Sequence, residues 1–242
     1  MRIVVVGGGS WGTAFSRLLA DRGHDVTLAC RDPEQARAID ETGRNPRYLR
    51  IVDLGGIPAA PLAEAPVAEA DVALVLVDSS EGVVEGDLSV ADVARKAGCA
   101  TLVVLSKWDV SQIRIEEIRP ELERRLRQRP SLIAVSAHSG RGVGRLLDEV
   151  ERLFDRYAGR IPTAELNRAL RELREARQPP SRNGKRLNLL YGAQVRTRPP
   201  RFRIHVSDPR LVTRDYGYWI ENELRRRFDL EGVPVSIDFV PR

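Results

Sequence analysis

The chain has 242 residues, of which 42% are hydrophobic and 30% charged, as is typical of a soluble globular protein with one large or two small domains. Its longest uninterrupted apolar run, residues 72–77, is too short to cross a bilayer, which excludes a membrane-spanning helix. The net charge is +5, but it is unevenly distributed: residues 160–242 hold 18 Lys and Arg against 10 Asp and Glu. We therefore expect this basic third of the chain to bind an anionic partner, and RNA is the partner that we favour. The alternative is an arginine-rich surface that only contacts solvent.

The first elements of the chain predict a strand–loop–helix unit. Residues 3–6 form an apolar run that predicts a strand, and a helical pattern with Phe15 and Leu19 on one face follows the glycine-rich residues 7–12. A second strand is predicted at residues 26–30, and Pro33 is suited to the first position of a second helix. Residues 43–68 are rich in Pro and Gly and give only weak strand signals.

A regular alternation of strands and helices returns after Asp71. Strands are predicted at residues 72–77, 101–105 and 132–135, and helices near 84–97, 115–128 and 143–157. Continuous apolar strands separated by helices indicate a mostly parallel sheet that is covered on both faces. We therefore expect an α/β fold, a three-layer sheet of the Rossmann-like or GTPase-like kind.

The order of elements changes beyond Gly159 and Pro162, where a second domain is expected. The predicted elements are a helix at 164–176, a turn at 179–184, strands at 187–196 and 201–207, a helix at 215–228 and a strand at 233–240. The expected core residues of this small α+β domain are Leu166, Leu170, Leu173, Ile204, Ile220, Leu224, Phe228, Ile237 and Phe239.

Gly7, Gly9 and Gly12 form a G-x-G-x-x-G pattern directly after a strand and at the start of a helix. Gly7 permits the tight turn, Gly9 lets a pyrophosphate approach the backbone, and Gly12 allows close packing of helix and strand. Arg31, rather than an acid, ends the second strand, which favours a ligand with a 2′-phosphate. The alternative is a tight strand–helix turn that binds nothing.

The longer run of residues 7–14, with residues 23–26, Arg31 and residues 45–49, resembles NAD(P)-dependent glycerol-3-phosphate dehydrogenase over about the first 70 residues. The resemblance implies that Ser10, Trp11, Arg31 and Tyr48 line an NAD(P) site together with the three glycines. The substrate domain of that family, with its catalytic lysine, has no counterpart in these residues, so hydride transfer is not expected.

A second nucleotide pattern follows the strands at 101–105 and 132–135. Ser106, Lys107 and Asp109 are similar to the N-K-x-D loop of GTPases, and Ser136 and Ala137 to their S-A loop. In such a half-site the Asp109 carboxylate accepts two hydrogen bonds from guanine, the Lys107 stem lies along the base, and the Ala137 amide meets the base carbonyl. Ser106 stands where an asparagine is usual, so one bracing amide is missing.

The surrounding sequence resembles the second GTPase domain and the C-terminal tail of the Der (EngA) family of ribosome-assembly GTPases. The matching residues are 70–78, 80–83, 107–109, 161–167, 194–200 and 231–234. The resemblance covers about residues 70–242 and implies a KH-like domain at 160–242 and a role in assembly of the large ribosomal subunit. No G-x-x-x-x-G-K-[ST] phosphate loop occurs, so we expect no GTP hydrolysis, and we assign no catalytic or metal-binding residue.

The two resemblances predict three segments and one shared sheet. Residues 1–70 are the dehydrogenase-like half, residues 71–159 are the GTPase-like half of the same sheet, and residues 160–242 are the KH-like domain. Both families have an alanine–aspartate step into an apolar strand near residues 70–78, and in both this strand lies beside the first strand. We therefore expect a continuous sheet with two base pockets around one phosphate position, which binds GTP, GDP or NAD(P) weakly.

The basic residues of the last segment predict contact with ribosomal RNA or the large subunit. They are Arg182, Lys185, Arg186, Arg196, Arg198, Arg201 and Arg203. Tyr191, Phe202 and Trp219 have the chemistry to stack on bases, but we expect them to pack in the core. Since no G-x-x-G clamp is evident, sequence-specific recognition of RNA is not expected.

Three functions stay open at this point. The chain is a Der-like RNA-binding protein without GTP turnover, an NAD(P)-binding protein of dehydrogenase ancestry, or a fusion product without a function.

Cys30 and Cys99 lie in or beside apolar stretches and are expected to be buried free thiols. With no basic segment or cleavage site after Met1, we expect no signal peptide and a cytoplasmic protein.

Overall fold

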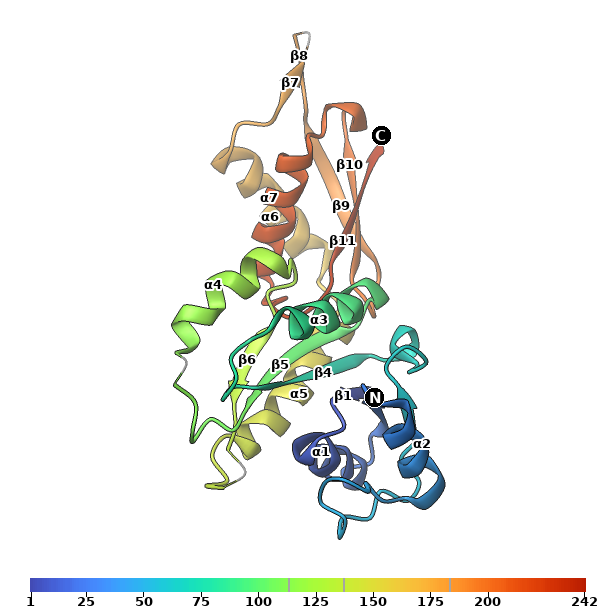
Figure 1. Ribbon diagram of the computed structural model, residues 1–242. Coiled ribbons are helices and arrows are strands. Elements are labelled where there is room, and N and C mark those ends of the chain that lie inside the picture. Colours follow the sequence, from blue (N-terminus) through green and yellow to red (C-terminus); the bar gives the residue numbers. More distant parts are fainter. Residues whose placement is uncertain (113, 137, 183) are drawn as a thin grey trace. The chain divides into compact units, whose positions relative to one another are not determined.

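A computed structural model of the protein describes residues 1–112, 114–136, 138–182 and 184–242, with the side chains of all of these except Glu121 and Arg182. The chain divides into two compact units, Met1–Phe154 (unit 1) and Asp155–Arg242 (unit 2). Each unit has its own sheet and helices (Figure 1). Among the described residues, no helix is both long and apolar enough to cross a bilayer.

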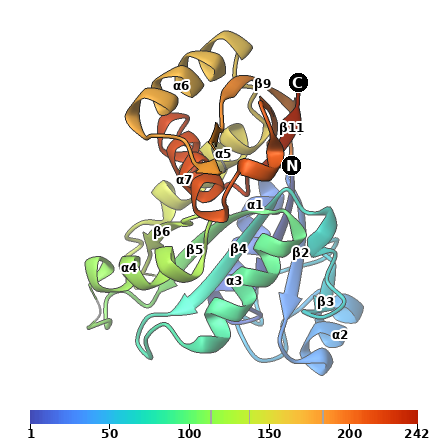
Figure 2. The same cartoon turned by 90° about the horizontal axis from the view of Figure 1, so that it is seen from above.

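Unit 1 is built on a six-stranded sheet in the order β3-β2-β1-β4-β5-β6, and all of its strand pairs are parallel. Helices α3 and α4 cover one face, and α1 and α5 cover the other (Figures 1 and 2). The elements are β1 (Arg2–Val6), α1 (Ser10–Asp21), β2 (Asp25–Cys30), α2 (Pro33–Thr42), β3 (Ala59–Pro61), the 3-10 helix η1 (Val67–Glu69), β4 (Val72–Asp78), α3 (Glu85–Ala97), β5 (Ala100–Ser106), α4 (Ile115–Arg125), β6 (Ser131–Ala134) and α5 (Val143–Ala158), the last of which runs into unit 2. The expected three-layer α/β fold is confirmed.

Strand β4 joins the two halves that resemble different families. It pairs with β1 from Ile3↔Val72 to Val6↔Val75 and with β5 along its whole length. Five of its seven residues are buried, as the unbroken apolar run requires for a strand covered on both faces. A continuous sheet therefore forms across the predicted junction.

The ends of some elements differ from the expectation. The stretch 43–68, for which only weak signals were seen, contains β3 and η1. Helix α4 ends at Arg125 rather than near residue 128, and Arg129 has a φ of 48° before Pro130. Leu126, the residue after the helix, is already extended, with a φ of −108° and a ψ of 99°.

Unit 2 has a three-stranded sheet in the order β11-β10-β9, with β9 antiparallel and β11 parallel to β10. Helices α6 and α7 lie on the same face of this sheet (Figures 1 and 2). The elements are α6 (Thr163–Ala176), β7 (Ser181–Arg182), β8 (Lys185–Arg186), β9 (Leu189–Arg196), β10 (Arg201–Val206), the 3-10 helix η2 (Pro209–Leu211), α7 (Arg214–Arg227) and β11 (Ser236–Pro241). The predicted turn at 179–184 thus includes a short β7–β8 hairpin, and the last strand begins three residues later than expected.

The core of unit 2 lies between α6, α7 and the sheet. Six of the nine expected core residues are buried, but Phe228, Ile237 and Phe239 are only half-buried. The last two lie on β11, an edge strand, where neighbours cover a side chain from fewer directions. Arg225 is also fully buried, and its guanidinium pairs with Glu221 at 3.0 Å one turn earlier on α7.

Candidate functional site

The glycine-rich loop connects β1 to α1 at the carboxyl edge of the sheet in unit 1, where the C-terminal ends of the parallel strands meet. Gly7 has a φ of 128°, which favours glycine, and a Cβ placed on Gly12 would lie 1.7 Å from the carbonyl oxygen of Gly7. Gly9 differs from both, because its φ of −77° suits any residue and a Cβ there would meet nothing within 4 Å. The fold thus requires glycine at 7 and 12, whereas Gly9 leaves open space in front of the first turn of α1.

The side chain of Asn45 holds this loop in place through hydrogen bonds. Its side chain is fully buried, and its Nδ2 donates to the Gly8 carbonyl at 2.9 Å and to the Thr13 hydroxyl at 2.7 Å. Its Oδ1 accepts from the backbone N–H groups of Arg47 and Tyr48 at 3.0 and 3.2 Å. One buried amide therefore holds both the glycine-rich loop and the segment that contains Tyr48.

Gln35 gives this arrangement a second anchor. Its Nε2 donates to the Gly8 carbonyl at 2.6 Å and to Asn45 Oδ1 at 3.1 Å. Cys30 lies at the same place, since a Cβ on Gly8 would come within 2.6 Å of its Sγ. Burial, with a smaller effect of the Asp32 charge, raises the pKa of the Cys30 thiol to about 11. The thiol is therefore a packing group, as expected, and Cys99 is likewise buried and free.

The other predicted NAD(P)-site residues differ in their exposure and contacts. Ser10 is exposed as the first residue of α1, whereas Trp11 is half-buried and stacks on Phe15 with ring centroids 4.8 Å apart. Arg31 is exposed after β2, and its Nη2 lies 3.6 Å from the position that a Cβ on Gly86 would take at the start of α3. Tyr48 is 43% exposed. Trp11 thus belongs to the packing of α1, while Ser10, Arg31 and Tyr48 have exposed side chains.

The residues that resemble a guanine-binding loop follow β5, two strands from β1. The Ser106 hydroxyl donates to the Val77 carbonyl at 2.8 Å and so ties β5 to β4. Lys107 has a φ of 54°, and its Nζ lies 2.6 Å from Oδ2 of Asp78 at the end of β4. This hydrogen bond and the Asp78 charge raise the pKa of Lys107. The Lys107 ammonium is therefore paired with a carboxylate of its own chain.

Asp109 is also engaged by a neighbour. The Ser136 hydroxyl is hydrogen-bonded to its carboxylate, which lowers the pKa of Asp109, and the two loops are joined by the Trp108 N–H, which donates to the Val135 carbonyl at 3.1 Å. The structure thus brings Asp109 and Ser136 together, as a base-reading site requires, but directs Lys107 to Asp78. Ala137 lies outside the described residues.

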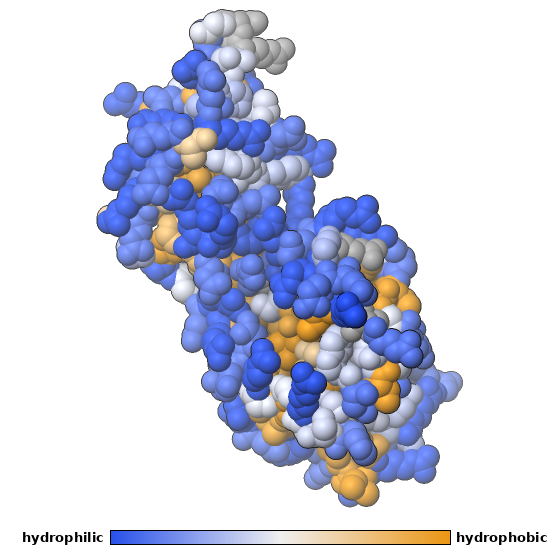
Figure 3. Space-filling model, turned by 90° about the vertical axis from the view of Figure 1, so that its left-hand side faces the viewer, coloured by the Kyte–Doolittle hydropathy of each residue, from blue (hydrophilic) through white to orange (hydrophobic). Residues whose placement is uncertain are grey.

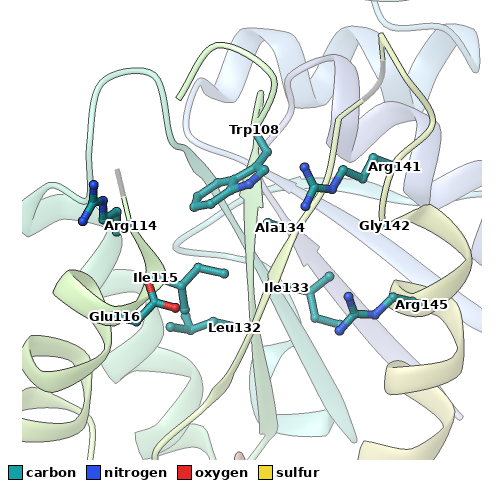
Figure 4. A pocket seen from close by; sticks show the side chains of 10 residues that line it. All are labelled: Trp108, Arg114, Ile115, Glu116, Leu132, Ile133, Ala134, Arg141, Gly142 and Arg145. Atoms are coloured by element: carbon teal, nitrogen blue, oxygen red, sulfur yellow. The ribbon is translucent and has the colours of Figure 1, made fainter. Parts of the chain in front are cut away.

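A cavity of about 340 Å³ lies close to this loop but beside strand β6 (Figure 4). The guanidinium of Arg141 points toward the indole of Trp108, and Arg145 lies next to Ile133, whereas Arg114 points away from the indole. Leu132, Ile133 and Ala134 of β6 form its floor. Trp108 of the base-reading loop lines this cavity, whereas the described guanine-site residues Ser106, Lys107, Asp109 and Ser136 do not.

The predicted RNA-binding residues of unit 2 are at its surface. Those with described side chains are all exposed: Lys185, Arg186, Arg196, Arg198, Arg201 and Arg203. Arg182 lies in β7. Arg201 is not an unpaired cation, because Nε and Nη2 of its guanidinium donate to the two carboxylate oxygens of Asp238 at 2.7 and 3.0 Å. Hydrophilic residues also cover most of the surface of unit 2 that Figure 3 draws in its upper part.

The three candidate stacking residues fall into different environments. Phe202 is fully buried, as expected, and Trp219 is half-buried with the Arg177 guanidinium 5.3 Å from its ring. The expectation that Tyr191 packs in the core is wrong, because Tyr191 is 50% exposed. Its place on β9 explains the difference: it pairs with His205 on the side of the sheet opposite to buried Ile204 and Val206.

Sequence reasoning missed Gln35 and Asn45 as organisers of the loop and Asp78 as the partner of Lys107. Asn45 stands before a proline in a stretch already noted for its resemblance, which was a usable signal for a structural amide. Nothing in the local sequence connects Asp78 with Lys107, since they meet only because β4 and β5 are neighbours. Among the described residues, no group of three or more His, Cys, Asp and Glu side chains could hold a metal ion.

Two protein families match different segments of the chain. The family described as the N-terminus of NAD-dependent glycerol-3-phosphate dehydrogenase matches residues 2–107, beyond the 70 or so residues of the resemblance. The family described as KH-domain-like of EngA bacterial GTPase enzymes, C-terminal, matches residues 160–239. The expected combination of two families in one chain is therefore confirmed.

Curated relatives agree with the second family. GTPase Der of Desulforudis audaxviator is 38% identical over 218 residues, which are 88% of this chain and 50% of that protein. GTPase Der of Roseobacter denitrificans is 39% identical over 174 residues, 69% of this chain and 35% of that protein. The chain thus spans half or less of the length of these relatives. Glycerol-3-phosphate dehydrogenase of Coxiella burnetii is similar in structure with a TM-score of 0.41 and 14% identity, over 99% of this chain and 53% of that one.

Proposed function

We propose that this chain, which joins a dehydrogenase-type N-terminal segment to an EngA-type C-terminal segment, is a Der-like protein that binds RNA through residues 160–242. In this proposal it takes part in assembly of the large ribosomal subunit, in the cytoplasm, and does not hydrolyse GTP. The observation that supports RNA binding most directly is the net charge of +8 on residues 160–242, whose predicted RNA-binding side chains are exposed wherever they are described. Such residues suit contacts with phosphate groups.

The absence of GTP turnover is inferred from the residues at the carboxyl edge of unit 1. The loop after β1 has neither the lysine that neutralises β- and γ-phosphates nor the hydroxyl that holds magnesium in a phosphate loop. Lys107, the one cation of the base-reading loop, is paired with Asp78. These features support weak nucleotide binding without catalysis.

The RNA-binding proposal is tested by fluorescence anisotropy of a labelled fragment of large-subunit ribosomal RNA, titrated with the full chain at several salt concentrations. Binding through phosphate contacts weakens steeply with salt, with a slope of about −0.7 to −0.9 per contact in the log–log plot. Replacing both Lys185 and Arg186 with Ala should reduce this slope by about two. Binding that is absent at low salt would contradict the proposal.

A second candidate function, NAD(P) binding, is supported by Gly9. No contact in the fold requires glycine at this position, whereas the close approach of a pyrophosphate to the backbone does. When NAD(P) is bound, its diphosphate would be held by the N–H groups at the start of α1, and Arg31 would face a 2′-phosphate. The residues therefore fit the group, which is the carrier of hydride in dehydrogenases.

The two candidates are separated by thermal unfolding with NADPH, GDP, GTP or no ligand at millimolar concentration. A ligand that binds only the native state raises the midpoint. A rise with NADPH that is lost in Gly9→Val supports the dinucleotide site, and a rise with GDP or GTP alone supports a guanine site at Asp109. No rise with any of the three contradicts nucleotide binding and leaves RNA binding as the remaining function.

A further inference from the structure

Within the described residues of unit 2, helices α6 and α7 cover one face of the sheet and no helix covers the other, which we call the open face (Figures 1 and 2). Along β10, Phe202, Ile204 and Val206 are buried and point toward α6 and α7, so Arg201, Arg203 and His205 point the other way. Their cross-strand partners Tyr191 and Ala193 on β9 and Ser236, Asp238 and Val240 on β11 share this face. All eight of these residues are exposed or half-exposed.

Tyr191 and His205 form an aromatic stack on the open face. Their rings are 4.2 Å apart between centroids and inclined by only 15°, and the two residues are opposite each other in the β9–β10 register. His205 Nδ1 lies 3.0 Å from the carbonyl oxygen of Pro241, which can only accept, so Nδ1 carries a hydrogen and the imidazole is held toward β11. The His205 ring on β10 is therefore held in place, and the Tyr191 ring on β9 forms the outer side of the stack, toward the edge of the sheet.

The outer side of the stack is the second face of the Tyr191 ring. Because His205 covers the face toward β10, the other face looks past β9, and β9 is the last strand of this sheet. The 50% exposure of Tyr191 agrees with one covered and one uncovered face. A tyrosine ring supported on one side and uncovered on the other suits the stacking of a further planar group.

A guanidinium lies next to this ring. Arg203 precedes His205 by two residues, so both side chains are on the open face, and the residue opposite Arg203 on β11 is Asp238. Both carboxylate oxygens of Asp238 bind Arg201 instead, and no ion pair of Arg203 is found within the described part of the chain. Arg203 is thus an exposed cation on the same strand face as the aromatic stack, two positions before His205 in the sequence.

We infer that the open face binds single-stranded RNA, with one unpaired base stacked on the outer face of Tyr191 and a neighbouring phosphate bound by Arg203. The inference rests on the proposed RNA binding and assigns it to a particular face and to a form of RNA. An aromatic ring beside a cation matches the two parts of a nucleotide, and stacking on aromatic side chains is the usual way in which proteins hold unpaired bases. A duplex has no free base face to offer, so the stack distinguishes the two forms.

Charge selects RNA as the occupant of this face over an apolar partner. Arg196, Arg201 and Arg203 are offset by the single acid Asp238, and its charge is used by Arg201. The β7–β8 hairpin adds Lys185 and Arg186, and the Ser207 hydroxyl next to β10 contacts the Arg186 carbonyl at 3.4 Å. A strand of RNA leaving the Tyr191 ring therefore has further cations within unit 2 to bind its phosphates.

The test compares five forms of the full chain in binding to a single-stranded oligoribonucleotide that contains 2-aminopurine, and to a duplex of the same length. Tyr191→Ala should weaken binding of the single strand about tenfold, since one base–aromatic stack is worth that order of affinity. Tyr191→Phe keeps the ring and should bind like the unmodified chain. Leu190→Ala, which removes another exposed apolar side chain of β9, is the matched control and should have no effect.

Stacking has its own signature in this experiment. Quenching of 2-aminopurine fluorescence should accompany binding to the unmodified chain and to Tyr191→Phe, and should be lost in Tyr191→Ala. Arg203→Gln should reduce the salt slope by about one and keep the quenching. The circular dichroism spectrum and unfolding midpoint of each variant verify that the small sheet is intact.

The outcomes separate this inference from the function on which it rests. If the unmodified chain binds RNA but Tyr191→Ala binds equally well, or if the duplex is preferred and quenching is absent, the assignment to the open face is overturned and RNA binding stands. If the unmodified chain binds neither form at low salt, both the inference and the proposed function fail.

Discussion

The glycine-rich loop after β1 and the base-reading loop after β5 lie on the same edge of one sheet but are held in different ways. The first is organised by the buried side chains of Gln35 and Asn45, which leave the space in front of Gly9 free. In the second, the side chains that would meet a base are bound to one another or to neighbours, as Lys107 is to Asp78. A loop that is held by buried side chains can accept a ligand without rearrangement. A loop whose ligand-binding groups are paired must first break those pairs.

Sequence similarity to a binding site and readiness of that site to bind are therefore separate properties. Asp109 and Ser136 meet as a guanine site requires, yet Lys107 points across to β4. In the dehydrogenase-like half, the side chains that fix the loop are ones that no ligand would contact.

The largest effect is expected from Gly12→Ala. The new Cβ would overlap the Gly7 carbonyl oxygen, 1.7 Å away, and backbone cannot move aside as a flexible side chain can. Overpacking of this kind costs about 3 kcal/mol, so the unfolding midpoint should fall by roughly 6–12 °C. Gly9→Ala is the matched control and should change stability by less than about 0.5 kcal/mol, because nothing lies near its Cβ.

Cys30 reports where the Gly12→Ala damage occurs. Its raised pKa and burial should protect it from a thiol reagent in the unmodified chain, as burial should protect Cys99, whose pKa is about 12. Disturbance of the loop should expose Cys30 and leave Cys99 protected, which mass spectrometry of the labelled chain distinguishes. Equal labelling of both would indicate unfolding of the whole unit, and no labelling would show that the loop absorbs the methyl group.

Asn45→Ala should have the next largest effect, a loss of about 2 kcal/mol in the free energy of unfolding measured with urea. The substitution removes the acceptor of the Arg47 and Tyr48 N–H groups and a donor to the Gly8 carbonyl in a fully buried place. It should also abolish any rise in midpoint with NADPH. A variant that keeps both its stability and the NADPH effect would show that Gln35 alone holds the loop.

The sequence predicted the elements of this region better than their connections. Hydrophobic periodicity located β1, β4 and β5, and the G-x-G-x-x-G pattern located the loop, because both depend on residues close together in the chain. The role of Asn45 depends on contacts with residues 32 and 37 positions away, and the Lys107–Asp78 pair depends on which strands are neighbours. Local patterns contain no information on such partners.

The same limit applies to unit 2. Phe202 and Ile204 of β10 were expected in the core, and both are buried. The face occupied by Tyr191 was not predictable in this way, because β9 and β10 have irregular register on both sides of the pair and the alternation on β9 is broken. The burial of Ile237 and Phe239 on β11 was overestimated for a related reason. Their apolar pattern does not reveal that β11 is an edge strand, which neighbours cover only in part.

Ser106→Ala should cost about 1 kcal/mol, less than Asn45→Ala. The Ser106 hydroxyl makes one hydrogen bond, to the Val77 carbonyl at 2.8 Å, and that carbonyl belongs to a strand that remains paired through its backbone. Urea unfolding of the two variants side by side measures the difference between the loops. A cost for Ser106→Ala that equals or exceeds that of Asn45→Ala would contradict the distinction drawn between them.

The smallest effect is expected from the Lys107–Asp78 pair. Burial acts to raise the pKa of Asp78, but hydrogen bonds from Lys107 and Ser80 outweigh it, so the folded-state pKa is lowered. The pair therefore stabilises the fold above the unfolded pKa of about 3.9, and this contribution is lost as the pH falls through the lower folded-state pKa. Because both side chains are partly exposed, solvent screening limits it to about 0.5 kcal/mol. A double-mutant cycle with Asp78→Asn and Lys107→Met should give this coupling at pH 7 and a smaller one at pH 2.5, where more of the Asp78 carboxyl is protonated. An unchanged coupling at the lower pH would mean that the Lys107 side chain is held by contacts other than the Asp78 charge, and the base-reading loop would then be as firmly fixed as the glycine-rich one.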